Sequence, residues 1–313
     1  MTDVSRKIPG VMKSWIPYLI FAALCAISIA ALFRPLAATI SLAFDNDEFT
    51  HILLILPISA ALIISEWTWL KLKSSPSPRM GGILIAFGVV IVLITRRESA
   101  ELAADTQVAL KMLALLTLLI AAFVFSFGST VARSSTFSLG FLFWMVPIPS
   151  LLLTQIVHWL QAGSAISASL LFLAAGVPVS RAGNVLLIPG LNIEVARECS
   201  SIRSSLMLLV TTMVLAHLLL RSPWRKAAVI LFAVPLSVAK NGLRIFVISI
   251  LGTRVDRGFL NGWLHQQGGI IFLLIALAII MLVIWFLRAQ EQAPPDKARL
   301  HLARVDALQT TSL

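Results

Sequence analysis

The segment GGIIFLLIALAIIMLVIWFL, residues 268–287, decides the fold class of this chain. Its 20 residues include no charged side chain, and a helix of that length spans the ~30 Å hydrocarbon core of a bilayer at about 1.5 Å per residue. Seven further apolar runs are candidates for the same interpretation: 16–33, 51–69, 80–95, 107–127, 137–160, 201–220 and 226–251. The sequence therefore predicts an all-α integral membrane protein with about eight transmembrane helices.

The composition of the 313 residues supports this prediction. Apolar residues make up 58% of the chain, and charged residues make up only 12%, against about 25% in an average soluble domain. So few charges cannot cover a water-facing surface, which excludes a soluble globular domain and a disordered chain. The net charge of +11 would suggest nucleic acid in a soluble protein. In a membrane protein its usual cause is Lys and Arg in cytoplasmic loops, so we expect no nucleic-acid partner.

The Lys and Arg residues outside the spans indicate the orientation. With the N-terminus in the cytoplasm, 14 of the 25 Lys and Arg residues fall in inner segments, seven in outer segments and the other four within spans. Because cytoplasmic loops carry an excess of Lys and Arg, this distribution places both termini inside. We expect residues 1–288 to form one polytopic membrane domain and residues 289–313 to form a polar, disordered cytoplasmic tail.

The pattern changes between the fifth and sixth runs. Pro147 and Pro149 lie in the middle of the fifth run, so that helix should be kinked or broken there. Residues 165–179 are apolar but too few to cross comfortably, which predicts an external re-entrant or interfacial helix. Residues 183–195 read as two short strands around a Pro189-Gly190 turn, a small hairpin before the sixth span.

The first of three polar segments near hydrocarbon is ECSSIRSS, residues 198–205, at the outer end of the sixth span. Cys199 precedes a helix N-terminus, where unpaired backbone amides favour the nucleophilic thiolate. Arg203 follows four residues later and would return to the same helical face, adding a cation near the sulfur. The alternative is structural, with Cys199 a small apolar filler and Ser200 the helix N-cap.

The other two polar segments belong to the next two spans. Lys240, Asn241 and Arg244 lie inside the seventh span, where a charge near the membrane centre costs about 2.5–3.5 kcal/mol on insertion scales. His265 leads into the last span from the outer side and could exchange a proton with Cys199. The alternatives are a buried structural network for the seventh span, with Lys240 a packing or snorkelling residue, and an ordinary interfacial histidine for His265.

The segments ECSSIRSSL, NGLRI and LHQQGG, in this order, resemble the exosortase/archaeosortase family of multi-span cysteine transpeptidases. The resemblance implies Cys199 as the nucleophile that forms an acyl-thioester, Arg244 as a proton donor or oxyanion partner, and His265 as the third catalytic member. We expect Arg203, Ser200 and Asn241 to bind substrate or stabilise the thiolate. No metal site and no cofactor are expected.

The resemblance also implies partners. Family substrates are secreted proteins with a C-terminal sorting signal, which consists of a short motif such as Pro-Glu-Pro, a transmembrane helix and a basic tail. The implied location is the cytoplasmic (inner) membrane. Cleavage at its outer face passes the acyl group to an acceptor nucleophile, which is unknown here, often in bacteria that make exopolysaccharide. The substrate helix would reach the site laterally through membrane lipid.

The sequence departs from the family pattern at three places. Ser201 stands where the family usually has Gly, Thr50-His51-Ile52 replaces the usual Ser-His-Gly, and Lys240 adds a charge. Two other function classes remain open. One is a transporter or channel for an anionic solute that uses intramembrane Arg244 and Lys240. The other is a non-enzymatic assembly factor.

Overall fold

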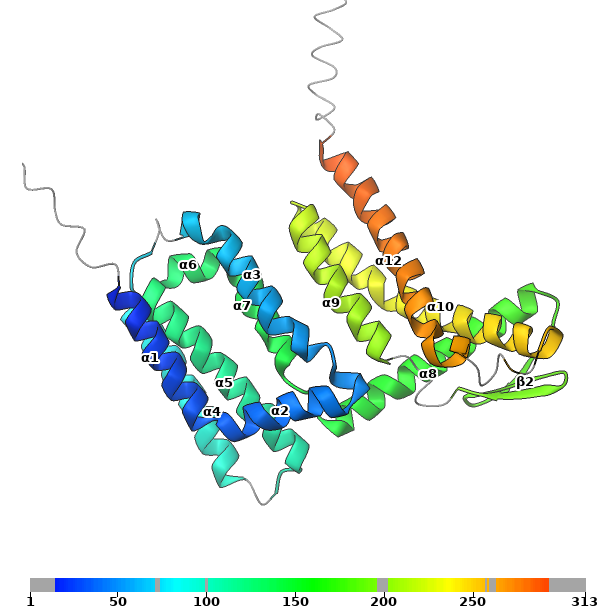
Figure 1. Ribbon diagram of the computed structural model, residues 1–313, viewed down its shortest axis with the longest axis horizontal. Coiled ribbons are helices and arrows are strands. Elements are labelled where there is room, and N and C mark those ends of the chain that lie inside the picture. The colour runs from blue at the N-terminus through cyan, green and yellow to red at the C-terminus, as the bar shows by residue number, and fades with distance from the viewer. Residues whose placement is uncertain are drawn as a thin grey trace, which may run out of the picture. The chain divides into compact units, whose positions relative to one another are not determined.

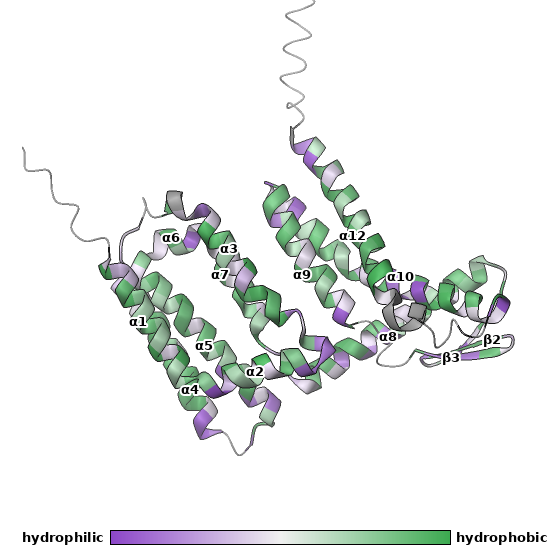
Figure 2. Cartoon of the chain, viewed as in Figure 1, coloured by the Kyte–Doolittle hydropathy of each residue, from purple (hydrophilic) through white to green (hydrophobic). Residues whose placement is uncertain are grey.

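The computed structural model describes residues 15–70, 74–98, 101–195, 202–256, 258 and 263–292, with side chains described for all of these except 68–69, 263–268 and 292. Within these ranges seven helices are long and apolar enough to cross a membrane, and the bent pair α1–α2 raises the number to eight if it counts as one span. The prediction of an all-α protein with about eight transmembrane helices is confirmed. Apolar residues run along the helices, and hydrophilic residues gather mainly at helix ends and connecting segments (Figure 2).

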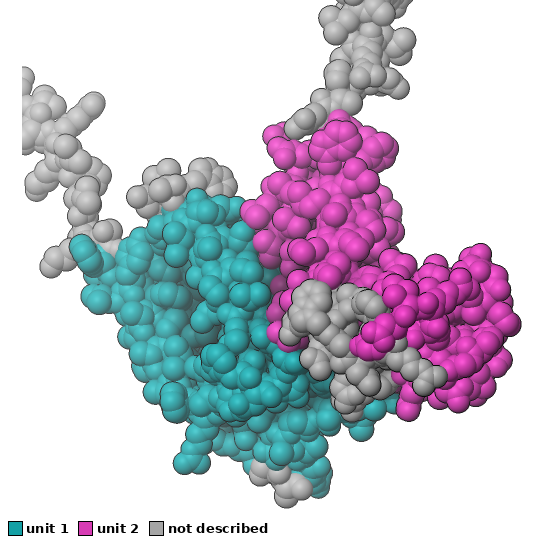
Figure 3. Space-filling model, turned by 45° about the vertical axis from the view of Figure 1, so that its right-hand side comes forward, with its two compact units in different colours: residues 1–156 teal, residues 157–313 magenta. Residues whose placement is uncertain are grey.

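The chain divides into two compact units, residues 1–156 and 157–313 (Figure 3). The helices that belong to the first unit are α1 (Ile16–Ala31), α2 (Phe33–Asp45), η1 (Asp47–Phe49), α3 (Ile52–Leu70), α4 (Pro78–Arg97), α5 (Ala104–Phe127), α6 (Ser129–Ser134), α7 (Thr136–Phe141) and η3 (Leu142–Met145). Helix α8 (Ser150–Ala174) begins at the end of this unit and continues into the second.

Helix α5 forms the core of the first unit. More than half of its apolar window is buried, because α1 and α4 both pack against it. A Cβ atom at Gly88 of α4 would lie 2.8 Å from the side chain of Leu118 on α5, so the glycine permits the two helices to approach closely. Helix α1 ends one residue before a bend of 76°, after which α2 runs in a different direction. The 16–33 run had not indicated this second, amphipathic helix.

The second unit contains the rest of α8, a small sheet and three long helices (Figure 1). These helices are α9 (Ile202–Leu219), α10 (Pro223–Arg254) and α12 (Trp263–Gln292). Their apolar faces share one core, to which α9 contributes Leu208 and Ala216, α10 contributes Val229 and Ala233, and α12 contributes Ala276, Ile280 and Ile284. Residues 289–292 of the predicted tail continue α12, and residues 293–313 lie outside the described residues.

The predicted hairpin is confirmed. Strand β2 (Val185–Ile188) pairs antiparallel with β3 (Leu191–Glu194) through the Pro189-Gly190 turn, where Gly190 adopts a φ of 83° that favours glycine. A third strand, β1 (Ser180–Ala182), which the sequence had not indicated, pairs with the other edge of β2. The sheet order is β1-β2-β3, and its apolar face packs on α8 and α10.

The prediction for residues 137–179 is partly wrong. The chain leaves the helical conformation over 146–149, as the two prolines require, but the long helix begins after this break and runs from Ser150 to Ala174. Residues 165–174 are its second half and not a separate re-entrant or interfacial helix. The physical reason is that no strong helix breaker follows Pro149 until the Gly176–Pro178 segment, while Asp105 accepts the first backbone N–H of α8 at 2.5 Å and fixes its start.

Candidate functional site

The predicted site residues fall into two groups. Arg203, Asn241 and Arg244 are described, and all three lie in the second unit. Cys199 and Ser200 lie outside the described residues. His265 lies in the first turn of α12, but its side chain is outside the described part of the structure. The convergence of sulfur, guanidinium and imidazole therefore stays a prediction.

Helices α8 and α10 meet at the NGLR segment. The amide Nδ2 of Asn241 donates a hydrogen bond to Ser164 Oγ of α8 at 2.9 Å, and both residues are buried. One residue later, a Cβ atom at Gly242 would overlap the side chain of Ser167 and lie 2.9 Å from the backbone nitrogen of Ala168. The glycine is needed because the backbones approach this closely, as small residues commonly permit between membrane helices.

The two helices run in the same direction along this contact. The contact begins at Gly163, whose added Cβ would lie 2.9 Å from Val238, and continues to the edge-to-face pair of Phe172 and Phe246, with ring centroids 5.0 Å apart. Residue numbers therefore rise together along both helices. The carboxyl ends of α8 and α10 lie at the same end of the unit, where the sheet also packs.

Helix α9 contacts the same segment of α10 from another side. The Lys240 ammonium donates a hydrogen bond to Ser204 Oγ in the first turn of α9, and the lysine side chain is only 6% exposed. Arg203 precedes Ser204 and is exposed. Arg244 lies one helical turn beyond Lys240 toward the carboxyl end of α10 and is partly buried. The start of α9 thus lies beside the polar segment of α10.

The described residues on either side of the segment 196–201, which contains Cys199, are both buried. Before it, the Val195 carbonyl accepts a hydrogen bond from Gln161 Nε2 at 2.9 Å, and Val195 belongs to the same buried cluster as Ile245 of α10. After it, Ile202 is 4% exposed and begins α9. Val195 therefore shares a core with the residue after Arg244, and two residues after Ile202 the Ser204 hydroxyl accepts the hydrogen bond from Lys240 of α10.

Sequence reasoning missed Gln161, Ser164 and Ser204 as positioning residues. Gln161 and Ser164 are three residues apart and share a face of α8, which is the spacing that could have revealed them. They were obscured because they fall between the fifth apolar run and the shorter apolar segment after it. His51 is buried at the start of α3 in the first unit. Among the described residues, no three His, Cys, Asp or Glu side chains are grouped to hold a metal ion.

Comparison with known proteins identifies the family. A profile for transmembrane exosortases (Exosortase_EpsH) matches residues 43–282, which is well over half of the chain. The chain belongs to the transmembrane exosortase family. No curated protein and no solved structure matches it. The matched part of this exosortase includes the Cys199 segment, the NGLR segment and His265. As a family member with long apolar helices, it is a multi-pass membrane protein.

Proposed function

We propose that this exosortase is a membrane-embedded cysteine protease and transpeptidase. It cleaves the C-terminal sorting signal of secreted proteins at the outer face of the cytoplasmic membrane and transfers them to an acceptor through an acyl-thioester on Cys199. Family membership supports the proposal. The observation that carries it is that described residues on both sides of the Cys199 segment contact α10 near Arg244: Val195 shares a buried cluster with Ile245, and Ser204 accepts a hydrogen bond from Lys240.

The chemistry has two balanced steps. In the first, the Cys199 thiolate attacks the scissile carbonyl, a C–S bond forms and the C–N bond breaks, while protonated His265 gives its proton to the departing amine. In the second, His265 takes a proton from the acceptor nucleophile, which attacks the thioester and releases the thiolate. The catalytic residues regain their starting protonation states after both steps.

The two arginines stabilise negative charge at different stages: Arg244 on the tetrahedral intermediate and Arg203 on the attacking thiolate. Arg244 lies in a membrane helix, where low dielectric strengthens a guanidinium–oxyanion contact, and a single such donor commonly contributes 10²–10³ in rate. Arg203, in the first turn of α9, would favour the thiolate of Cys199. Asn241 is the positioning residue, because its hydrogen bond to Ser164 fixes α10 and therefore the height of Arg244 in the membrane.

The loop charges support an outer location for the site. With twice as many Lys and Arg in the inner segments as in the outer ones, the connection between α8 and α9, which includes the sheet, faces outward. The parallel course of α8 and α10 brings the carboxyl end of α10 to the same face. A substrate that is delivered by secretion would meet the thiol on that side.

The test is to co-express the full chain with a secreted reporter that ends in a Pro-Glu-Pro-type motif, a transmembrane helix and an Arg-rich tail. Cys199→Ala should abolish reporter processing without changing the amount of exosortase, and mass spectrometry of the active protein should find the reporter fragment attached to Cys199. Arg244→Gln should lower processing by about 10²–10³. Arg254→Gln, at the end of the same helix, is the control and should process normally.

Continued processing by Cys199→Ala would refute the mechanism. Failure of the unsubstituted protein to process the reporter would agree with the transporter alternative, in which the cysteine has no chemical role. That alternative needs the Lys240 cation for solute binding, whereas the structure gives its ammonium a hydrogen bond to Ser204. A Lys240→Met variant that processes the reporter would therefore contradict the transporter.

A further inference from the structure

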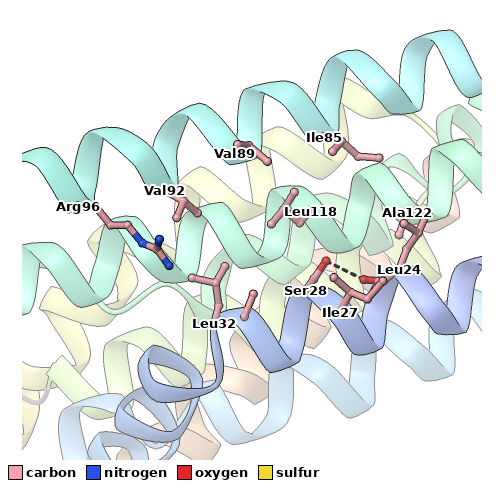
Figure 4. A pocket seen from close by; sticks show the side chains of 11 residues that line it. Leu24, Ile27, Ser28, Leu32, Ile85, Val89, Val92, Arg96, Leu118 and Ala122 are labelled. Atoms are coloured by element: carbon pink, nitrogen blue, oxygen red, sulfur yellow. Dashed lines mark hydrogen bonds between the residues drawn. The ribbon is translucent and has the colours of Figure 1, made fainter.

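A cavity in the first unit has no role in the proposed chemistry. Helices α1, α4 and α5 line a partly open space of about 240 Å³, and Arg96 of α4 extends toward it (Figure 4). The lining has only two side chains with polar atoms, Ser28 and Arg96. The Ser28 hydroxyl already donates a hydrogen bond to the Leu24 carbonyl at 2.8 Å. The cavity is therefore an apolar space with one cation at its border.

The lining residues of α4 follow one face of the helix. Ile85, Val89, Val92 and Arg96 recur every three or four positions, the spacing of a single helical stripe. From Ile85 to Arg96 the stripe is about 16 Å long at 1.5 Å per residue, which is about half of the ~30 Å hydrocarbon core. Arg96 lies in the last turn of α4, so the cation is at the interface end of the stripe.

We propose that this cavity binds an anionic phospholipid, with one acyl chain along the α4 stripe and the headgroup phosphate on Arg96. The apolar length matches one leaflet, and a guanidinium can hold phosphate oxygens with two parallel, charge-assisted hydrogen bonds. The volume lies below the ~300–1,000 Å³ of usual small-molecule pockets, which fits a single chain whose headgroup and second chain remain outside. A further helix, about 10 Å across with its side chains, needs more room.

The proposed site differs from an ordinary crevice between membrane helices because it requires a lipid whose headgroup is negatively charged. The neighbouring Arg97 provides the control, because it occupies the same last turn and is also exposed but does not line the cavity. Both arginines interact favourably with the carboxyl end of the helix dipole. A difference in phospholipid retention between an Arg96 variant and an Arg97 variant therefore reports binding at the cavity.

The experiment uses the full chain reconstituted in mixed vesicles of phosphatidylglycerol and phosphatidylcholine and then extracted for native mass spectrometry. The wild-type protein should retain phosphatidylglycerol in preference to phosphatidylcholine. Arg96→Gln should lower that retention by about tenfold or more, as expected for loss of a hydrogen bond to a charged group, while Arg97→Gln should leave it unchanged.

A second pair of variants tests the acyl-chain site. Val89→Trp would fill the cavity, and Val90→Trp, at a residue of similar exposure that does not line it, is its control. Val89→Trp should reduce phosphatidylglycerol retention and Val90→Trp should not. Equal retention of the two lipids, equal effects of the two arginine variants, or a bound second copy of the chain instead of lipid would overturn the proposal. None of these measurements depends on reporter processing.

Discussion

Substitution of Gly242 by alanine tests the contact on which the candidate site depends. The added Cβ would overlap the Ser167 side chain and lie 2.9 Å from the backbone nitrogen of Ala168, which is closer than real Cβ contacts allow. A serine can rotate, but the backbone nitrogen belongs to a helix and cannot move alone. We expect α8 and α10 to separate slightly at this point.

The expected cost follows from two opposing effects. Overpacking of a well-packed contact costs about 1–3 kcal/mol. Alanine recovers about 0.5–1 kcal/mol, because glycine is the poorer residue in a helix interior. The net destabilisation is therefore about 0–2.5 kcal/mol relative to the wild type, and about 1–3 kcal/mol relative to a Gly→Ala control without the clash. It increases by about 1 kcal/mol if the separation also breaks the Asn241–Ser164 hydrogen bond.

Thermal unfolding of the purified protein in detergent measures this difference. Gly269→Ala in α12 is the matched control, because a Cβ there has no described atom within 4 Å and should leave stability unchanged or slightly improved. Adding Ser167→Gly to Gly242→Ala should restore part of the loss by removing the overlapped side chain. A Gly242→Ala protein as stable as Gly269→Ala would refute the close approach of α8 and α10.

Three further predictions concern polar contacts of the second unit. Ser204→Ala should destabilise the protein by about 1–3 kcal/mol, because the buried Lys240 ammonium loses its hydrogen bond to the serine hydroxyl. Lys240→Met should be nearly neutral. In a double-mutant cycle of unfolding midpoints, Lys240→Met should suppress the Ser204→Ala defect. Ser164→Ala should cost about 1–3 kcal/mol by removing the acceptor of the Asn241 amide, and a loss within measurement error would contradict that hydrogen bond. Glu291→Gln should lower the unfolding midpoint and speed hydrogen exchange at residues 221 and 222, because the Glu291 carboxylate accepts both backbone N–H groups at 2.9 Å; unchanged exchange there would refute this role.

The sequence predicted most of the membrane helices because a long apolar run records a bilayer crossing directly. The prediction failed where the bounds of an apolar run do not coincide with those of a single helix. The run 137–160 contains two short helical segments, a break and the first turns of α8, and the prolines reveal the break but not which side forms the span. Strand β1 was missed because Ser180–Ala182 is only three residues long and all three are exposed, without the alternation that marked β2 and β3.

The candidate site was predictable on α10 and not on α8. Lys240, Asn241 and Arg244 are conspicuous because charges and amides are costly in hydrocarbon. Ser164 and Ser167 are ordinary in a membrane helix, and their importance comes only from the helix that packs on them. The roles of Cys199 and His265 stay predictions, since the described side chains do not include theirs.

The Pro189-Gly190 turn has a practical consequence for labelling the protein. It is bounded by paired strands, and a Cβ at Gly190 meets no described atom within 4 Å. A short tag inserted at that turn should be tolerated and would offer a handle on the face of the membrane where the chemistry is proposed.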